Sequence, residues 1–474
     1  MSDPTVVVPT RDDPVIAGNA EIVGGDLGKH AYSSWRFWGP LPILVIFALG
    51  GFVLGLLSKT PCTVSGWVDP GRYTHLCYSD IPPLYSLRGF ADNVIPYVQN
   101  PLPGQEQLEY PVLTGLFMTV ANWLTPHDDN GTLWFFYVNA VMLAICLVVA
   151  VVATALTVRR RPWDAAMVAL APGTILCATI NWDLLAVALA AVGMALWARR
   201  YPTWAGVAIG AAAAAKFYPF LLLGPLLVLC WRAGRMNAFA RVFVGAIGAW
   251  LVLNVPFMMI NFDGWARFYT FSSERGEDFG SVWLLMTNIG IGLPASVLNK
   301  VATGLFLLLC VGIAVLALRT IRRPRFAQLA FLVVAAFVIT NKVYSPQYVL
   351  WLIPLAAMAR PRWRDFLIWQ VGQVLYFAAI WLYLVGYTSE NKGLPIGWYS
   401  ISIILAIAST CYFGGMVIRD MLHPEHDPVR TDHFEEDRDD PGGGVLDGAP
   451  DRGRNQSVAD DAAGAEVAEP TVSA

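Results

Sequence analysis

One segment concentrates the residues that are best suited to chemistry. Asp80 lies in Tyr78-Ser79-Asp80-Ile81-Pro82-Pro83-Leu84-Tyr85, where a carboxylate stands among aromatic and apolar residues. Desolvation raises the pKa of such a carboxyl group toward the range in which it can accept a proton. The alternative is a solvated loop residue that caps the turn after it. A second acid, Glu109, lies further along the chain, directly before Tyr110 and Pro111.

Two isolated lysines stand where pairs of apolar segments meet. Lys216 begins Lys216-Phe217-Tyr218-Pro219, and Lys342 begins a polar and aromatic stretch that ends at Tyr348. A third polar cluster, Asn181-Trp182-Asp183, opens another apolar segment. Ionisable residues so placed usually face a protein interior or a wet cavity, and a compact ammonium group suits a phosphate. Snorkelling of the lysines toward the interface is the alternative.

Composition identifies the elements that must position these residues. The 474 residues are 56% hydrophobic and 14% charged, with a mean hydropathy of +0.51, whereas a soluble domain has about 25% charged residues. A water-soluble single-core protein is therefore excluded. No basic stripe lies outside short loops, which excludes nucleic-acid binding. The segment from His423 to Ala474 has 14 acidic residues and 4 arginines, a net charge of −10, and the rest of the chain has +7.

About twelve apolar segments have a length near that needed to cross a membrane, about 17–25 residues. They are residues 41–57, 133–157, 164–180, 182–199, 202–216, 217–232, 239–260, 295–319, 326–340, 344–359, 365–387 and 397–418. The sequence therefore predicts an all-α, multi-pass membrane bundle. Residues 111–124 are apolar too, and we expect them to form a re-entrant or membrane-skimming helix, or else a thirteenth span.

Arginine clusters predict the orientation of the bundle. They occupy five short loops, and two spans separate each cluster from the next, so all five can face the cytoplasm together. The clusters are Arg159–Arg161, Arg199–Arg200, Arg232/Arg235/Arg241, Arg319/Arg322/Arg323/Arg325 and Arg360/Arg362/Arg364. Both termini would then be cytoplasmic, and the plasma membrane is the expected location.

This topology divides the chain into three parts. Residues 1–40 form a cytoplasmic N-terminal segment, residues 41–422 the membrane domain, and residues 423–474 an acidic cytoplasmic tail. The tail has too few apolar residues to offset its ordering entropy, so we expect disorder. A long folded loop, residues 58–132, follows the first span on the outer face. It holds Cys62 and Cys77, which we expect to form a disulfide in an oxidising compartment, with two free thiols as the alternative.

Together these residues resemble the polyprenyl-phosphate-sugar-dependent glycosyltransferases with the integral-membrane GT-C fold, and glycosyltransferase family 87 in particular. The resemblance covers most of residues 40–420. Its most specific motif is Lys342-Val343-Tyr344-Ser345-Pro346-Gln347-Tyr348 followed by Trp351-Leu352-Ile353-Pro354. Supporting matches are Ala215-Lys216-Phe217-Tyr218-Pro219 and Asn181-Trp182-Asp183.

The resemblance also assigns a catalytic acid. Family members place it in the first outward loop, often in an Asp-x-x-x-x-Tyr stretch, and Asp80 to Tyr85 has this spacing. Two positions depart from the family pattern: Ser79 replaces a common Gly, and Tyr110-Pro111-Val112 replaces Tyr-Pro-Pro. Asp80 is therefore the first candidate for the general base, and Glu109 is the reserve candidate.

The implied activity is inverting transfer of a sugar, most often mannose, from a polyprenyl-phosphate donor to an envelope glycan or glycolipid on the outer face. Lys342 and Lys216 would bind the donor phosphate, with no metal and no other cofactor. The expected partners are the lipid-linked donor, the glycan acceptor and membrane lipid. The residues expected to line the substrate site are Tyr85, Tyr110, Asn181, Asp183, Tyr218, Tyr344, Gln347 and Tyr348.

Two other classes of function stay open at this point. A transporter or flippase of a lipid-linked sugar would bind near the bilayer midplane, usually between internal repeats, and the sequence contains no clear repeat. A non-catalytic scaffold for envelope assembly is the third possibility. The loop at residues 261–294 interleaves aromatic residues with acids and arginines, as sugar-binding sites do, but ordinary interfacial loops share this composition.

Overall fold

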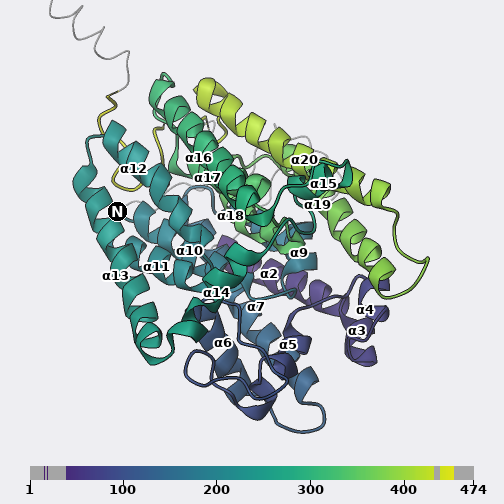
Figure 1. The fold of residues 1–474 in the computed structure, drawn as a ribbon. Helices are drawn as coiled ribbons and strands as arrows, with labels where there is room; N and C mark the ends of the chain where they lie inside the picture. The colour runs from purple at the N-terminus through teal and green to yellow at the C-terminus, as the bar shows by residue number, and fades with distance from the viewer. Residues whose placement is uncertain (1–14, 16–18, 20–38, 432–437, 453–474) are drawn as a thin grey trace, which may run out of the picture.

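The apolar segments form helices, because a backbone in lipid must satisfy its own N–H and C=O groups. The computed structural model describes residues 15, 19, 39–431 and 438–452, and its regular secondary structure is helical throughout these residues. Most of the helices pack side by side in one bundle (Figure 1). The predicted all-α class is confirmed.

Six helices of the described chain are long and apolar enough to cross a membrane. They are α2 (Pro40–Leu57), α7 (Gly131–Thr157), α13 (Met236–Ile260), α16 (Ala295–Arg319), α19 (Trp363–Leu384, continued by η5, Val385–Tyr387) and α20 (Ile396–Leu422). The 18 residues of α2 extend about 27 Å at 1.5 Å per residue, close to the thickness of the hydrocarbon core. The chain is a multi-pass membrane protein, as predicted.

Shorter apolar helices fill the interior of the bundle. Every residue of α18 (Val349–Ala359, preceded by η4, Pro346–Tyr348) is buried, whereas α13 and α16 are largely exposed. The other short helices are α6 (Val112–Trp123), α10 (Asp183–Ala198), α11 (Pro202–Ala215), α12 (Leu223–Arg232, preceded by η3, Tyr218–Leu222) and α17 (Phe326–Thr340). Because these helices are shorter than a full span, the predicted count of twelve spans is not confirmed.

One predicted span is broken into pieces. Residues 164–180 form the end of η2 (Pro162–Ala165), then α8 (Ala166–Leu170) and α9 (Pro172–Cys177). Pro172 has no N–H to continue the helix, and the residue before it, Ala171, adopts ψ 129° outside the helical region. The prediction of a continuous helix here is wrong for this reason.

Two glycines allow α11 and α13 to pack closely. A Cβ atom on Gly206 would lie 2.0 Å from the carbonyl oxygen of Val242, and one on Gly210 would lie 2.1 Å from that of Ala246. The spacing of four residues puts both glycines on one face of α11. Small residues at this spacing let helix backbones approach each other in a membrane, where packing rather than water exclusion drives association.

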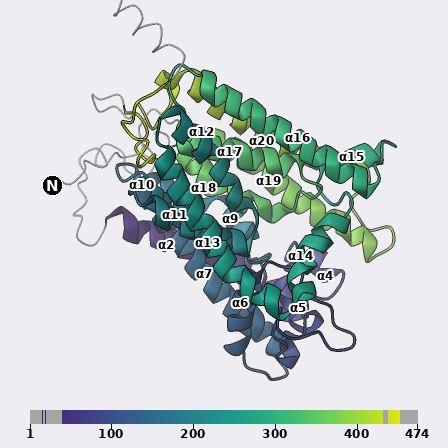
Figure 2. The ribbon, with the colours of Figure 1, turned by 60° about the vertical axis from the view of Figure 1, so that its left-hand side comes forward.

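The arginine-bearing turns gather at one end of the bundle, as the predicted parity requires. Arg161 donates to the carbonyl oxygen of Pro428 at 3.0 Å, and Arg232 pairs with Asp451. Arg360, in the turn before α19, pairs with Asp420 near the end of α20. Figure 2 shows the yellow C-terminal segment at this end of the bundle and the helices of the first loop at the opposite end.

The acidic segment after His423 is partly packed, which differs from the disorder expected for residues 423–474. Residues 423–431 and 438–452 contact the arginine-bearing turns, and the rest of the tail lies outside the described residues. Composition alone misses this order because the partners of the acids are arginines far away in the sequence. Ordering this segment costs conformational entropy. Ion pairs and backbone hydrogen bonds offset that cost here, in place of buried apolar side chains.

Asp427 makes the best-buried of these contacts. Its carboxylate accepts hydrogen bonds from Arg325 at 2.7 and 2.9 Å, and both side chains are at most 1% exposed. Gln328 donates to the same carboxylate at 3.1 Å. Asp440 accepts a hydrogen bond from the backbone N–H of Phe326 at 2.9 Å, at the first residue of α17. The tail thus holds the arginine-bearing end of α17.

The opposite end of the bundle carries the first loop, residues 58–132. It forms α3 (Thr60–Ser65), α4 (Gly71–Thr74), α5 (Ile81–Leu87), η1 (Phe90–Asp92) and α6. A disulfide joins Cys62 to Cys77, as expected, with their Cα atoms 5.8 Å apart. A second excursion at this end forms α14 (Phe262–Glu274) and α15 (Val282–Asn288). Residues 112–123, expected to skim the membrane, form a helix that extends only about 18 Å.

The tail contact predicts a stability difference between two neighbouring acids. Asp427→Asn leaves the buried Arg325 without a carboxylate, which costs about 3–5 kcal/mol. We expect the thermal unfolding midpoint of the detergent-solubilised protein to fall by several degrees. The matched control is Glu425→Gln, because that side chain is 63% exposed and its loss should leave the midpoint unchanged. Equal midpoints for the two variants would contradict a packed tail.

Candidate functional site

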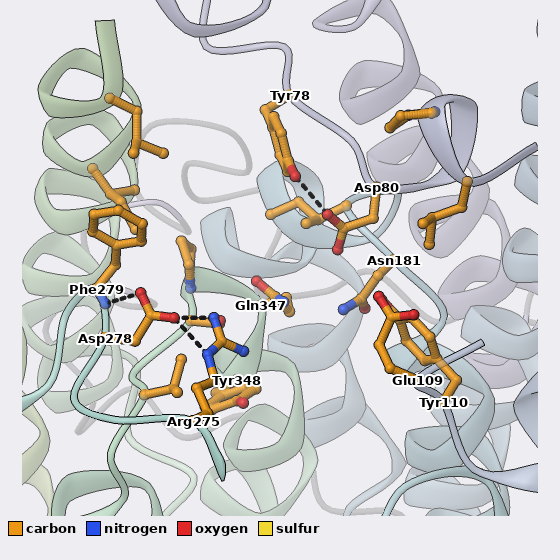
Figure 3. A pocket seen from close by; sticks show the side chains of 18 of the residues that line it. Tyr78, Asp80, Glu109, Tyr110, Asn181, Arg275, Asp278, Phe279, Gln347 and Tyr348 are labelled. Carbon is orange, nitrogen blue, oxygen red and sulfur yellow. Dashed lines mark hydrogen bonds and ion pairs between the residues drawn. The ribbon is translucent and has the colours of Figure 1, made fainter. Parts of the chain in front are cut away.

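A pocket of about 550 Å³ opens at the end of the bundle that carries the first loop. Three parts of the chain form its walls (Figure 3). The first loop contributes Asp80, Glu109 and Tyr110, and the ends of buried helices contribute Asn181, Lys216, Gln347 and Tyr348. The segment after α14 contributes Arg275, Asp278 and Phe279. Residues far apart in the sequence thus share one half-open chamber.

Backbone contacts fix Asp80 at the pocket wall. It stands directly before α5, and its N–H donates to the carbonyl oxygen of Ile180 at 2.7 Å. The preceding residue, Ser79, donates its hydroxyl to the carbonyl oxygen of Thr179 at 2.7 Å. The phenol of Tyr78 donates to the Asp80 carboxylate at 2.7 Å. Burial raises the pKa of Asp80 above its ordinary value, although the Tyr78 hydrogen bond and the Lys216 charge oppose this.

Three carboxylates line the pocket, and arginines hold two of them. Glu109 accepts hydrogen bonds from Arg88 at 2.7 and 2.9 Å, and Asp278 pairs with Arg275. Within the described part of the chain, Asp80 has no ion-pair partner at salt-bridge distance, and its side-chain hydrogen bond comes from the neutral Tyr78. A carboxylate that is not already neutralised can accept a proton more readily than one held by an arginine. This difference favours Asp80 over Glu109 as the base.

Lys216 lies at the pocket wall in the turn between α11 and η3. Its ammonium group is 3.0 Å from a carboxylate oxygen of Asp183 and 5.2 Å from the centre of the Tyr110 ring. Burial is the largest single influence and would lower the pKa of Lys216, but the Asp183 carboxylate, Tyr348 and Asp80 together outweigh burial and raise this pKa. Lys216 is therefore a cation at neutral pH, placed in a pocket whose other wall carries Asp80.

Lys342 does not line the pocket, which corrects its expected role as a phosphate ligand. Its ammonium group donates to the carbonyl oxygens of Ser272 and Arg275 at 2.8 and 2.6 Å. These carbonyls lie at the C-terminal end of α14, where the helix dipole attracts a cation. Lys342 thereby holds the end of α14 and places Arg275 at the pocket. The cation that reaches the chamber from this side is Arg275.

Four of the eight expected substrate-lining residues line the pocket, namely Tyr110, Asn181, Gln347 and Tyr348. The other four do not, because they pack inside the bundle or the loop. Tyr85 contacts Phe135, Tyr218 stacks on Trp351 at 4.6 Å, and Tyr344 bonds to Gln373. Asp183 is buried and does not line the pocket itself, but it forms an ion pair with Lys216, which does.

Three pocket residues have no signal in the sequence that separates them from their neighbours. Arg72 lies over the rings of Tyr73 and Tyr78, with its guanidinium carbon 4.9 and 5.7 Å from their centres. Trp381, in α19, stacks on Tyr78 at 4.5 Å. Arg275 belongs to the aromatic and charged loop at residues 261–294, so composition indicates the loop but not the residue. Helix packing, which local sequence does not encode, brings them to the chamber.

No metal-binding cluster is found among the residues that the structure describes: none of the His, Cys, Asp and Glu groups there gathers in threes. The absence of an obligatory metal therefore stays a prediction. The positive charge of the chamber comes from Lys216, Arg275 and Arg72.

Residues 108–340, just under half of the chain, match the family model of glycosyltransferase family 87. This match confirms the resemblance to family 87 that the sequence predicts, and the class of enzyme that this family defines is a glycosyltransferase. The matched range contains Glu109, Lys216 and Arg275. Asp80 and Lys342 lie outside it, so their roles depend on the geometry described above.

One solved structure with detectable likeness is the crystal structure of ArnT from Cupriavidus metallidurans bound to undecaprenyl phosphate. It is 14% identical to this chain, with 81% of this chain and 78% of that chain covered and a TM-score of 0.44. No curated protein matches the sequence at a significant level.

The raised pKa of Asp80 predicts that its removal stabilises the protein. Because the folded state binds the proton of Asp80 more tightly than the unfolded state does, the stability that Asp80 contributes is present at low pH and is lost as the pH rises through the folded pKa. We therefore expect Asp80→Asn to raise the thermal midpoint at pH 7, and the gain to shrink as the pH is lowered.

Glu109→Gln serves as the matched control in the same measurement. It weakens the bidentate pair with Arg88, whose side chain is 9% exposed, so we expect the midpoint to fall. An Asp80→Asn variant that is less stable than the wild type at pH 7 would contradict an Asp80 that is unpaired and desolvated.

Proposed function

We propose that this enzyme transfers a sugar, mannose, from a polyprenyl-phosphate donor to a glycan or glycolipid acceptor of the cell envelope. The reaction takes place on the outer face of the plasma membrane, with both chain termini in the cytoplasm. The observation that carries the proposal is the charge arrangement of the pocket. Asp80, which has no ion-pair partner among the described residues, shares a chamber at the end of a membrane bundle with Lys216 and Arg275.

The proposed reaction uses Asp80 as the general base. An acceptor hydroxyl gives its proton to the Asp80 carboxylate as its oxygen attacks the anomeric carbon of the donor sugar. The bond between that carbon and the phosphate oxygen breaks, and polyprenyl phosphate leaves with the bonding electron pair. Attack opposite the departing phosphate inverts the anomeric centre.

The departing phosphate needs positive charge on the far side of the sugar. Lys216 and Arg275 both line the pocket, and each is paired with a carboxylate, Asp183 and Asp278 respectively. These pairs hold the cations in place before the donor binds. A phosphate can then bind them in addition to the carboxylates, because an ammonium has three donors and a guanidinium has five. Preplaced donors of this kind stabilise charge that develops in the transition state.

The position of the pocket favours transfer over transport. A flippase or transporter binds its substrate near the bilayer midplane, at the interface between repeats. Here the chamber lies at one end of the bundle, and loops form two of its walls. Pro346, Gln347 and Tyr348 of η4 line the chamber, and α18, which follows them, is buried throughout.

Activity measurements on two acids test the assignment. In proteoliposomes with radiolabelled polyprenyl-phosphate-mannose and an alkyl mannoside acceptor, we expect Asp80→Asn to reduce turnover about 10²–10⁴-fold. Glu109→Gln keeps a side chain of similar shape beside Arg88, so turnover should fall less than tenfold in this variant. Polyprenyl-phosphate-glucose, -galactose and -arabinose are assayed in parallel to identify the sugar. Undiminished turnover in Asp80→Asn would remove Asp80 as the base, and movement of the lipid across the bilayer without new glycosidic bonds would favour transport.

If Arg275, which directly follows α14, binds the donor phosphate, its replacement should weaken binding of the donor. Arg275→Gln removes a charged donor from the pocket, which is worth about 1.5–3 kcal/mol. We expect the KM for the lipid-linked donor to rise about tenfold or more, with a smaller change in the KM for the acceptor. Arg267→Gln is the matched control, because Arg267 is on α14 outside the pocket lining. Equal donor KM values for both variants would exclude Arg275 from the phosphate site.

A further inference from the structure

The reaction proposed above makes no use of a lysine that is completely buried beside the base. Lys59 stands between α2 and α3 and is 0% exposed. Its ammonium group donates to the carbonyl oxygen of Tyr78 at 2.9 Å, and no carboxylate lies within salt-bridge distance of it among the described residues. Burying a cation with so few partners is costly, so its retention needs a reason beyond stability.

Lys59 and the disulfide form two adjacent cross-links between the same two segments. Cys62, one helical turn after Lys59, is bonded to Cys77, and Lys59 binds the next residue along, Tyr78. The first cross-link is covalent and the second is a hydrogen bond from a charged group. Together they attach the start of the Tyr78–Asp80 segment to the N-terminal end of α3.

The remaining sides of the Tyr78–Asp80 segment are held by the bundle. Ser79 and Asp80 bond to the carbonyl oxygens of Thr179 and Ile180, and the Tyr78 ring stacks on Trp381 with ring centres 4.5 Å apart. The Lys59 ammonium group adds its bond to the Tyr78 carbonyl oxygen and lies 6.0 Å from the centre of the Phe377 ring. Its bond to the Tyr78 carbonyl fixes the residue whose hydroxyl donates to Asp80.

From this geometry we infer that Lys59 is a positioning residue for the catalytic base. It holds the backbone of Tyr78, so that the Tyr78 hydroxyl keeps its hydrogen bond to Asp80, and it adds a buried positive charge that favours the ionised form of Asp80. The inference rests on the proposed function, in which Asp80 accepts the proton of the acceptor hydroxyl.

The charges around the pair agree with this role. Burial lowers the pKa of Lys59 to about 8, while Cys177 and Asp80 raise it, so Lys59 is mostly charged at pH 7. The Asp80 carboxylate raises the pKa of Lys59, so the two charges attract each other. Apart from burial, the leading influences on the pKa of Asp80 come from Tyr78, Lys216, Asp183 and Glu109. Lys216 approaches the base from the chamber and is available to the substrate. Lys59 is fully buried and is not among the residues that line the chamber, so it does not contact the substrate.

Kinetics of Lys59 variants test the inference. Lys59→Gln keeps a hydrogen-bond donor and removes the charge, and Lys59→Met removes both at similar length. For Lys59→Met we expect kcat to fall about ten- to a hundredfold while both KM values stay within about threefold, because a displaced base slows the chemical step rather than binding. Lys59→Gln should retain more of kcat than Lys59→Met.

The pH profile separates positioning from a purely structural role. Loss of a nearby cation makes ionisation of Asp80 harder, so the acid limb of the kcat profile should move to higher pH in both variants. The matched control is Lys300→Met, an exposed lysine on α16, which should leave kcat and the profile unchanged. A Lys59→Met enzyme with the wild-type kcat and acid limb would overturn the inference.

A measurement without substrate keeps the two proposals distinguishable. In a double-mutant cycle on thermal midpoints at pH 7, Asp80→Asn should raise the midpoint more in the Lys59→Met background than in the wild type, because Lys59 no longer stabilises the carboxylate. Additive shifts would overturn the coupling of the two residues. Activity retained by Asp80→Asn would instead remove the proposed base, whatever the cycle shows.

Discussion

A single backbone hydrogen bond joins the two halves of the site, from the N–H of Asp80 to the carbonyl oxygen of Ile180. It ties the first loop to the turn before α10, about a hundred residues later in the chain. The Ser79 hydroxyl strengthens the contact by bonding to Thr179. The hydroxyl of Thr114 in the first loop adds a further contact, to the carbonyl oxygen of Ala215 at 2.6 Å, directly before Lys216. The depth and charge of the pocket depend on these contacts.

Some charged residues of the chamber have an ion-pair partner and Asp80 has none among the described residues. We assign the roles of base and phosphate ligand from this difference. The cations of the chamber are held by carboxylates, Lys216 by Asp183 and Arg275 by Asp278, and Glu109 is held by Arg88. Asp80 has a tyrosine instead of an arginine beside it. A desolvated acid without a counter-ion is a cost to the folded state, and sites of catalysis are where such costs are found.

The sequence predicts the parts of this site that depend on local pattern. Apolar length and arginine spacing indicate the helices and their common ends, and the motif around Asp80 indicates the acid. Four of the eight residues expected to line the site do so, and Tyr85, Tyr218, Tyr344 and Asp183 instead pack behind it. A polar or aromatic residue in an apolar chain is expected near the end of a helix. Whether its side chain faces the chamber depends on how that helix is rotated about its axis, which the residue type does not indicate.

Lys342 and Lys59 illustrate this limit most clearly. Lys342 belongs to the most specific motif, yet its nearest acceptors are carbonyl groups at the end of α14, a helix some seventy residues earlier. Lys59 carries no motif and lies directly behind the base. The partner of each lysine is brought near by folding. Because this partner is distant in the sequence, the residues next to the lysine do not indicate it.

The packed acidic segment also has a bearing on biosynthesis. Asp427, Asp439 and Asp451 are made after the arginines of the earlier turns with which they pair, Arg325, Arg323 and Arg232 respectively. While the ribosome is still extending the chain, each arginine turn keeps its full charge, which is the state in which positive residues direct the insertion of neighbouring helices. The acids are made later than these turns, and they then cancel those charges. The order of synthesis thus lets the same arginines first guide topology and then serve as anchors in the finished protein.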